Sequence, residues 1–353
     1  MMNILSLARP EVRGLVVYPG PDLGENSIRL HANEAARALD ALALAGLNRY
    51  PDVRPAGLTR KMAELYGVTA ENVLVTRGSS EGIDLLMRAF CVAGQDEVLL
   101  TPPAFEMYQV YASIQGAATV SVPLQADKDY SVDAEALLGA CNERGKLIFL
   151  SSPNNPVGTV VPRQQIEKIL RALEGKCVVV VDEAYVEFSE SGSLVSLVAE
   201  HENLVVLRTL SKAYALAGAR CGAVVASPPL IVLLEGLLPP YALSSPVVSL
   251  AELALSSRNI ACARKNIRET VAERERVRRM LATCSVIEKI WPSEANFLFV
   301  GVTDVDSVKK RLAEAGVIIR TYDDNSQLQG CVRISIGTVD ENNSFLDAIR
   351  SLG

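Results

Sequence analysis

The 353-residue sequence has only two histidines, His31 and His201, and a single tryptophan. So few histidines exclude a histidine-rich metal site and leave little room for a Ser-His-Asp catalytic arrangement. The seven cysteines lie far apart, mostly beside aliphatic residues, and none of them forms a Cys-x-x-Cys pair. We therefore expect reduced thiols in the core of a cytoplasmic protein, and no bound metal.

Long apolar runs and blocks of one charge are also missing. Apolar stretches such as residues 230–238 are interrupted by Glu235 and Gly236 and are far shorter than the ~20 residues of a membrane span. The first ten residues lack the basic and apolar regions of a signal peptide. The net charge of −6 comes without a basic cluster, which argues against nucleic acid or an anionic membrane as a partner. Small-molecule chemistry is favoured.

The middle of the chain, from about residue 58 to 226, alternates amphipathic helices with short apolar runs. This pattern is typical of an α/β protein in which helices cover both faces of a mostly parallel sheet. The clearest helix contains Ile83, Leu86 and Phe90 and is expected to end at Gly94, and a second should begin at Pro162 and end near Gly175. The predicted strands are residues 73–75, 97–100, 147–150, 177–181, 204–207 and 222–226.

After Pro246, a long charged helix is expected at residues 251–281, followed by a smaller unit of strand (296–300), helix (305–315) and strand (331–336). We therefore predict three parts in the chain. Residues 1–45 form an N-terminal segment that packs with the small domain, residues 46–245 form the large domain, and residues 246–353 form the linking helix and a small α+β domain.

Polar side chains follow four of the predicted strands, and the carboxyl ends of parallel strands meet at one edge of a sheet, so these side chains should share one site. Lys212, among small and apolar residues, would be partly desolvated, which lowers a lysine pKa and suits an amine that forms a Schiff base. Asp182, directly after a buried strand, needs a cationic partner such as a pyridinium nitrogen. The alternatives are a solvated lysine on a turn and a carboxylate that caps the next helix.

Two further loops supply candidate ligands for a phosphorylated cofactor. Asn155, in a turn between two prolines, and Tyr185 could both reach an oxygen on a cofactor ring, although Asn155 can also be explained by turn formation alone. Ser79 and Ser80 precede the strongest helix, where backbone N–H groups attract anions, and Ser211 with Arg220 could hold the same phosphate ester. A serine in this place is also a common helix cap.

Three more residues have both a functional and an ordinary interpretation. Phe105 follows another strand end and could stack on a planar heterocycle or lie in the core. Arg333 should point away from Val332 and Ile334, and with Arg320 it could bind an anionic group of the substrate. Both arginines could instead be ordinary surface residues.

The order of these motifs resembles a known family. Ser-Ser-Pro-Asn-Asn-Pro-Val-Gly (151–158), Val-Asp-Glu-Ala-Tyr (181–185) and Thr-Leu-Ser-Lys-Ala-Tyr-Ala-Leu-Ala-Gly-Ala-Arg-Cys-Gly (209–222) are similar to the signature of fold-type I pyridoxal-phosphate aminotransferases. Residues 47–51, 77–82 and 332–338 narrow the resemblance, which runs almost end to end, to the histidinol-phosphate aminotransferase family. It implies a large domain with a mostly parallel sheet, a smaller domain, and pyridoxal 5′-phosphate as the cofactor.

Carried over to this chain, the resemblance assigns a role to each candidate. Lys212 would be the Schiff-base lysine and proton shuttle, and Asp182 would pair with the ring nitrogen. Asn155 and Tyr185 would contact the phenolic oxygen, and Phe105 would stack on the ring. The cofactor phosphate would be held by Ser79, Ser80, Ser211, Arg220 and, from the neighbouring subunit of a homodimer, Tyr50.

For the substrate, the resemblance points to Tyr18, Asn33, Arg320 and Arg333. It implies amino-group exchange between L-histidinol phosphate and 2-oxoglutarate, giving imidazole-acetol phosphate and L-glutamate, a step of histidine biosynthesis. Phe105 replaces a common tyrosine, Ser80 replaces an acidic or amide residue, and Ala35-Ala36 replaces Asn-Pro. An aromatic or broad-specificity aminotransferase and a phosphothreonine decarboxylase remain alternatives, and a non-catalytic cofactor sensor is disfavoured because no basic DNA-binding segment precedes the domain.

Overall fold

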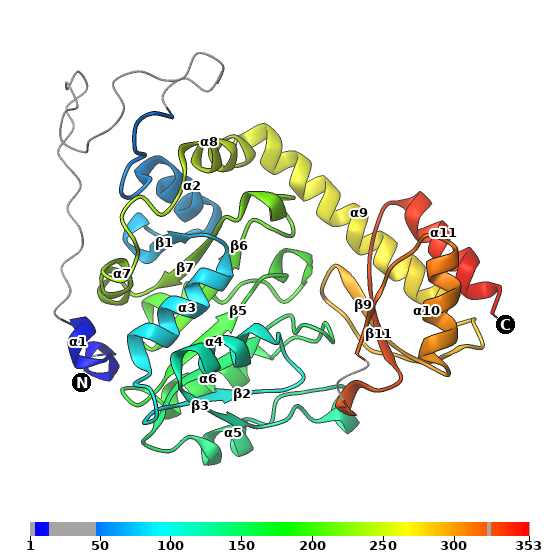
Figure 1. Cartoon of the computed structure of the whole chain (residues 1–353), viewed down its shortest axis with the longest axis horizontal. Coiled ribbons are helices and arrows are strands. Elements are labelled where there is room, and N and C mark those ends of the chain that lie inside the picture. The colour runs from blue at the N-terminus through cyan, green and yellow to red at the C-terminus, as the bar shows by residue number, and fades with distance from the viewer. Residues whose placement is uncertain (1–3, 14–46, 323–325, 353) are drawn as a thin grey trace.

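The computed structural model describes residues 4–13, 47–322 and 326–352. It confirms the predicted α/β architecture, with a seven-stranded sheet in a large lobe and a four-stranded sheet in a small one, linked by a long helix (Figure 1). The described residues contain no helix that is both long and apolar enough to cross a membrane.

The large sheet contains every strand predicted for it and one more. Its spatial order is β1 (Val73–Thr76), β7 (Gly222–Ala226), β6 (Leu204–Thr209), β5 (Val178–Asp182), β4 (Gly145–Ser151), β2 (Glu97–Leu100) and β3 (Ala118–Ser121). The unpredicted strand, β3, lies at the edge and is largely exposed, so it lacks the apolar run of a central strand. β7 runs antiparallel to both neighbours, because the β6–β7 connection contains only a three-residue helical turn and no α-helix to carry the chain back.

Alternate residues of the central strands pack on opposite faces, as period-two side-chain geometry requires. Val178 and Val180 pack with α3 (Ser79–Phe90), α4 (Met107–Gln115) and α7 (Pro228–Glu235). Val179 and Val181 pack with α5 (Ala134–Ala140) and α6 (Arg163–Ala172). A third group, α2 (Ala56–Tyr66) and α8 (Ser245–Ala254), covers β1 and β7.

Two predicted helix boundaries were wrong, whereas the end of α6 lies near Gly175 as predicted. α3 ends at Phe90 rather than Gly94, because Cys91 already has an extended backbone. α6 ends at Ala172, just before the turn that contains Gly175. The single helix expected at residues 251–281 is divided into α8 and α9 (Ser257–Leu281), because Ser256 is extended and begins a new helix.

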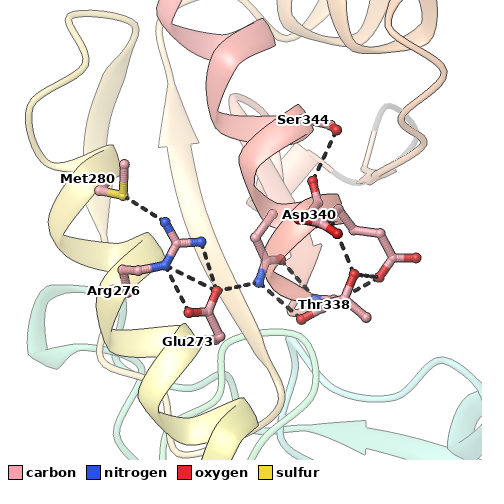
Figure 2. Close-up of polar contacts among 9 residues, drawn as sticks. Glu273, Arg276, Met280, Thr338, Asp340 and Ser344 are labelled. Carbon is pink, nitrogen blue, oxygen red and sulfur yellow. Dashed lines mark hydrogen bonds and ion pairs between the residues drawn. The ribbon is translucent and has the colours of Figure 1, made fainter.

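The small sheet has the antiparallel order β10 (Arg320–Thr321), β11 (Cys331–Ser335), β9 (Phe297–Val302) and β8 (Ile287–Ile290). The short strands β8 and β10 were not predicted. α9, α10 (Val305–Glu314) and α11 (Val339–Arg350) cover one face, where Val332 and Ile334 are buried. A hydrogen bond joins the start of α11 to α9, because the Asn342 side chain donates to Glu273 of α9. Glu273 also pairs with Arg276 of the same helix (Figure 2).

The other face of the small sheet packs on the large lobe. Phe299 lies in one cluster with Trp291 and Tyr130, and Phe297 contacts Tyr185 edge-on. Residues 4–13 form a short helical turn (Ile4–Leu7) and α1 (Pro10–Arg13), which pack with the core beneath α3 and α7 rather than on the small sheet. The rest of the N-terminal segment, residues 14–46, lies outside the described residues, and the three-part division of the chain stays a prediction.

Candidate active site

One pocket at the carboxyl edge of the large sheet collects most of the predicted residues. The loops after β4, β5 and β6 and the start of α3 all open into it, as the strand-end argument requires. Its predicted lining residues are Ser79, Ser80, Phe105, Asn155, Asp182, Tyr185, Ser211, Lys212 and Arg220. An adjoining pocket shares Phe105, Asn155, Tyr185 and Lys212 and adds Arg320 and Arg333 from the small lobe.

Asp182 is a buried carboxylate at the floor of this pocket. It is the last residue of β5 and only 4% exposed. The Tyr108 hydroxyl donates a hydrogen bond to Oδ2 at 2.7 Å, and the Ala184 N–H donates to Oδ1 at 3.1 Å. Burial raises the pKa of Asp182, whereas both hydrogen bonds and the charge of Lys212 act to lower it.

Lys212 faces Asp182 across the pocket from the loop after β6. Its ammonium makes no hydrogen bond or ion pair with any residue that the structure describes, and it lies 5.6 Å from the centre of the Tyr185 ring. The Lys212 side chain remains accessible from the pocket, but partial burial removes water from around its ammonium and so lowers its pKa. The positive charges of Arg333 and Arg220 lower this pKa further. A lysine in this setting is suited to react as a free amine.

Tyr185 and Asn155 line the wall between the two lobes. Tyr185 is nearly buried, and this burial raises the pKa of its hydroxyl to about 12, so the phenol keeps its proton at neutral pH. The Asn155 side-chain oxygen accepts a short hydrogen bond from Arg333, and its backbone N–H donates to Ser151 at 3.3 Å. Both side chains can therefore offer a hydrogen bond to an oxygen held in the pocket.

An anion cradle lies where the start of α3 meets the loop before β7. The Arg220 guanidinium donates to the Ser211 hydroxyl at 3.4 Å and lies so close to Gly78 that a Cβ there would be 2.8 Å from it. A Cβ at Gly222 would likewise be 2.8 Å from the backbone nitrogen of Ser79. The two glycines bring Arg220 and Ser211 against the first N–H groups of a twelve-residue helix, which is a favourable place for a phosphate.

Phe105 lines the pocket just before α4 and packs against Tyr108 in the first turn of that helix. Its ring meets that of Tyr108 edge-on, with centroids 5.6 Å apart. Tyr108 in turn stacks on Phe149 at 4.8 Å. Phe105 thus presents a fixed aromatic surface to the pocket without being part of the buried core.

Two arginines face each other in the adjoining pocket. Arg320 and Arg333 are directly opposite in the antiparallel β10–β11 pair, an arrangement in which like charges repel. The Nε atom of Arg333 is buried and has no hydrogen-bond partner among the described residues. Arg320 pairs at 3.2 Å with Glu106 of the large lobe. An anion bound between the two guanidinium groups would relieve the repulsion and supply the missing acceptor.

Of the predicted residues that the structure describes, Tyr50 alone lies outside both pockets. Tyr50 lies on the surface, 49% exposed, and stacks on Tyr241 with ring centroids 4.6 Å apart. Tyr18 and Asn33 lie outside the described residues, as does His31.

Two groups at the site were missed by the sequence analysis. Tyr108 and Glu106 belong to the segment after Phe105, where Glu106 precedes α4 and Tyr108 lies in its first turn. Arg208 is the other omission. This buried residue of β6 pairs with Glu183 at 3.3 Å and Glu187 at 2.7 Å, and so anchors the loop that carries Asp182 and Tyr185.

Comparison with known proteins shows the family. Residues 21–349 match the model of the aminotransferase class I and II family. Histidinol-phosphate aminotransferases from Xanthomonas euvesicatoria and Xylella fastidiosa (strain Temecula1) are 42% and 43% identical to the chain, and each alignment covers 99% of this chain and 97% of the relative. The chain belongs to the histidinol-phosphate aminotransferase family. The resemblance inferred from the motifs is thereby confirmed.

A solved structure agrees with this membership. The histidinol-phosphate aminotransferase of Sinorhizobium meliloti, in complex with pyridoxal-5′-phosphate, superposes with a TM-score of 0.77 at 25% identity. The match covers 86% of this chain and 84% of that chain. Among the residues that the structure describes in this chain, no cluster of three or more His, Cys, Asp or Glu side chains could hold a metal ion.

Proposed function

We propose that this chain is a pyridoxal 5′-phosphate-dependent transaminase that exchanges an amino group between L-histidinol phosphate and 2-oxoglutarate. The products would be imidazole-acetol phosphate and L-glutamate, in a step of histidine biosynthesis. The observation that carries the proposal is the meeting, in one pocket, of a partly desolvated lysine, a buried carboxylate and a helix-end anion cradle. Full-length relatives with this activity in their names support the choice of substrate.

The pocket fits the cofactor in three chemical respects. Ser79, Ser80, Ser211 and Arg220 would hold its phosphate at the start of α3. Asp182 would hold the proton on its ring nitrogen, and this pairing would offset the cost of burying the carboxylate. Asn155 and Tyr185 would hydrogen-bond to its phenolic oxygen, with Phe105 against the ring face.

The bound cofactor would supply an aldehyde that reacts with amines and a ring that disperses negative charge. The chain's own task is to position groups and move protons. Lys212, with its lowered pKa, would bind the cofactor covalently through Nζ and, once released, carry a proton at that nitrogen. Asp182 would keep the ring cationic, and the protonated Tyr185 would donate to the phenolic oxygen.

Arg320 and Arg333 would bind the phosphate of histidinol phosphate and the distal carboxylate of glutamate in turn. Both ligands place an anion away from the reacting amine, and two guanidinium forks can accept either geometry. The opposed arginines on β10 and β11 support this role. Tyr18 and Asn33 would complete the substrate pocket.

We also propose a cytoplasmic homodimer in which Tyr50 reaches the cofactor phosphate of the neighbouring subunit. Tyr50 is exposed and does not line the pocket of its own chain, and Leu47, three residues earlier, is 41% exposed. An exposed apolar surface of this kind favours a protein contact. Sedimentation at micromolar concentration should give the mass of a dimer, and a monomer that retains full activity would contradict the role of Tyr50.

The function can be tested by recording the visible spectrum of the cofactor-loaded protein while L-histidinol phosphate is added without a keto acid. The absorption band of the bound cofactor should be lost at far lower concentrations of histidinol phosphate than of phenylalanine or unphosphorylated histidinol. Lys212→Ala should abolish this response, whereas Lys176→Ala, which changes an exposed lysine, should not.

Each outcome has a distinct meaning. Conversion by phenylalanine alone would keep the role of Lys212 and reject histidinol phosphate as the substrate. If the wild-type protein has no cofactor band at all, the whole proposal fails.

A further inference from the structure

Tyr108 lies behind the pocket, against the buried carboxylate of Asp182. It lies on α4, is 1% exposed, and donates its hydroxyl to Asp182 Oδ2 at 2.7 Å. The residue does not line the pocket, so it can touch neither substrate nor solvent there. Its hydroxyl can therefore affect the reaction through Asp182, and its ring only through the packing of Phe105.

The ring of Tyr108 is held rigidly between two other aromatic side chains. It stacks on Phe149 of β4 with an interplanar angle of 23°, and Phe105 meets it at 87°. Because both contacts use the ring, the direction of the hydroxyl is set by packing and not by the hydrogen bond alone. The donor is therefore aimed at Asp182 before any ligand binds.

The chemistry of this contact favours the ionised form of Asp182. Burial and the nearby carboxylate raise the pKa of Tyr108 well above its usual value, so the phenol remains a hydrogen-bond donor throughout the working pH range. A buried carboxylate without donors would become protonated. Tyr108 and the Ala184 N–H each serve a different oxygen of Asp182, which also fixes the plane of the carboxylate.

We propose that Tyr108 is a positioning residue that keeps Asp182 ionised and aimed into the pocket. This inference deepens the proposed function, because it rests on Asp182 as the partner of the cofactor's ring nitrogen. The other titratable groups that face Asp182 are Lys212, whose charge favours the carboxylate, and the neutral Tyr185. Neither replaces the Tyr108 donor, since no hydrogen bond joins them to Asp182 among the described residues.

The test is the dissociation constant of pyridoxal phosphate, measured by titrating the apoprotein between pH 6 and pH 9, for the wild type, Tyr108→Phe, Asp182→Asn and the double variant. Phenylalanine keeps the ring in its stack, so the fold should survive. Removing a hydrogen bond to a charged group should weaken cofactor binding on the order of tenfold near pH 6. The loss should shrink as the pH rises, because without its donor Asp182 has a higher pKa and needs a higher pH to ionise.

In the Asp182→Asn background, Tyr108→Phe should change the dissociation constant less than about twofold, because the carboxylate on which Tyr108 acts is gone. The acid limb of the pH profile of kcat/KM should shift upward in Tyr108→Phe alone. Tyr111→Phe is the matched control, since Tyr111 lies on the same helix and has no contact with Asp182.

Two results would overturn the inference. Equal weakening by Tyr108→Phe in the wild-type background and in the Asp182→Asn background would mean that the hydroxyl acts through packing. A loss of cofactor affinity in Tyr108→Phe that does not change with pH would also mean that the hydroxyl acts through packing. If Asp182→Asn leaves the affinity and the spectrum of the bound cofactor unchanged, the role of Asp182 in the proposed function falls as well, so the two failures can be told apart.

Discussion

Two glycines, Gly78 and Gly222, shape the anion cradle because they have no side chain. Gly78 has φ of +78° and ψ of 168°, a backbone conformation that is essentially restricted to glycine. Its missing side chain leaves room for the Arg220 guanidinium, and Gly222 lets the start of β7 approach the first N–H groups of α3. The positive charge and the helix end can therefore act on one ligand.

Gly78→Ala should disturb this arrangement twice. The backbone strain should lower the free energy of unfolding by roughly 1–3 kcal/mol, and the added Cβ should displace Arg220 and weaken pyridoxal phosphate binding at least tenfold. Gly94→Ala is the control, because Gly94 also has a positive φ, of +70°, but nothing lies within 4 Å of its Cβ position. Thermal unfolding and cofactor titration of both variants check the prediction. Equal cofactor affinity in the two variants would show that the space at Gly78 is not needed for Arg220 to bind the cofactor phosphate.

At the level of whole elements, the start of α3 and the pairing of β10 with β11 bring positive charge to the two pockets. The short pair β10–β11 sets Arg320 opposite Arg333, and α3 begins at the pocket. Three helices cover the other face of the small sheet and fix its strands. α11 is secured at its start by a capping box, in which Thr338 accepts from the Glu341 N–H at 3.3 Å and Glu341 accepts from the Thr338 N–H at 2.7 Å.

Thr338→Ala should loosen the first turn of α11. Loss of such a cap costs about 1 kcal/mol, so amides at the start of the helix should exchange with deuterium about fivefold faster. Thr338→Ser keeps the hydroxyl and should exchange like the wild type. Hydrogen exchange followed by mass spectrometry measures the effect, and unchanged exchange in the alanine variant would show that the ties of Asn342 to Glu273 and Gly337 hold this end without the cap.

Considering the molecule as a whole, the two lobes meet at the active site through a few polar contacts. Arg333 binds Asn155, Arg320 pairs with Glu106, and Glu294 of the small lobe accepts hydrogen bonds from residues 189–191 of the large lobe. The contact near Glu294 is reinforced by Arg274, which donates to the Ala295 carbonyl at 2.9 Å. Arg320 and Arg333, the residues proposed to bind the substrate, thus reach the pocket of Lys212 only because the lobes are docked.

The pair of Glu106 and Arg320 should compete with anionic ligands. Both side chains are more than half exposed, at 68% and 54%, so the pair is weak and an incoming phosphate can displace Glu106. In the cofactor-loaded enzyme, Glu106→Gln should therefore strengthen competitive inhibition by inorganic phosphate, by up to about fivefold. Glu135→Gln, which breaks an exposed pair with Lys168 elsewhere, is the control and should leave the inhibition constant unchanged. Weaker inhibition in Glu106→Gln would show that Glu106 supports Arg320 instead of competing for it.

Much of this description could be predicted from the sequence, because the relevant signals are local. Runs such as residues 178–181 are apolar and β-branched throughout, which favours buried strands, and polar residues directly after such strands are expected at the carboxyl edge of a parallel sheet. The family motifs around Asn155, Asp182 and Lys212 then supplied candidate roles. The alternation of Arg333 with Val332 and Ile334 also placed it on the correct face.

The remaining features depend on contacts between residues far apart in the chain. Tyr108 is 74 positions from Asp182, and nothing in its helix distinguishes it from an ordinary core tyrosine. Glu106 and Arg320 are 214 positions apart, and their pairing follows from the docking of two lobes. Strand direction in β7, the break before α9 and the facing of Arg320 with Arg333 likewise arise only when the sheets assemble, because packing and register override local propensity there.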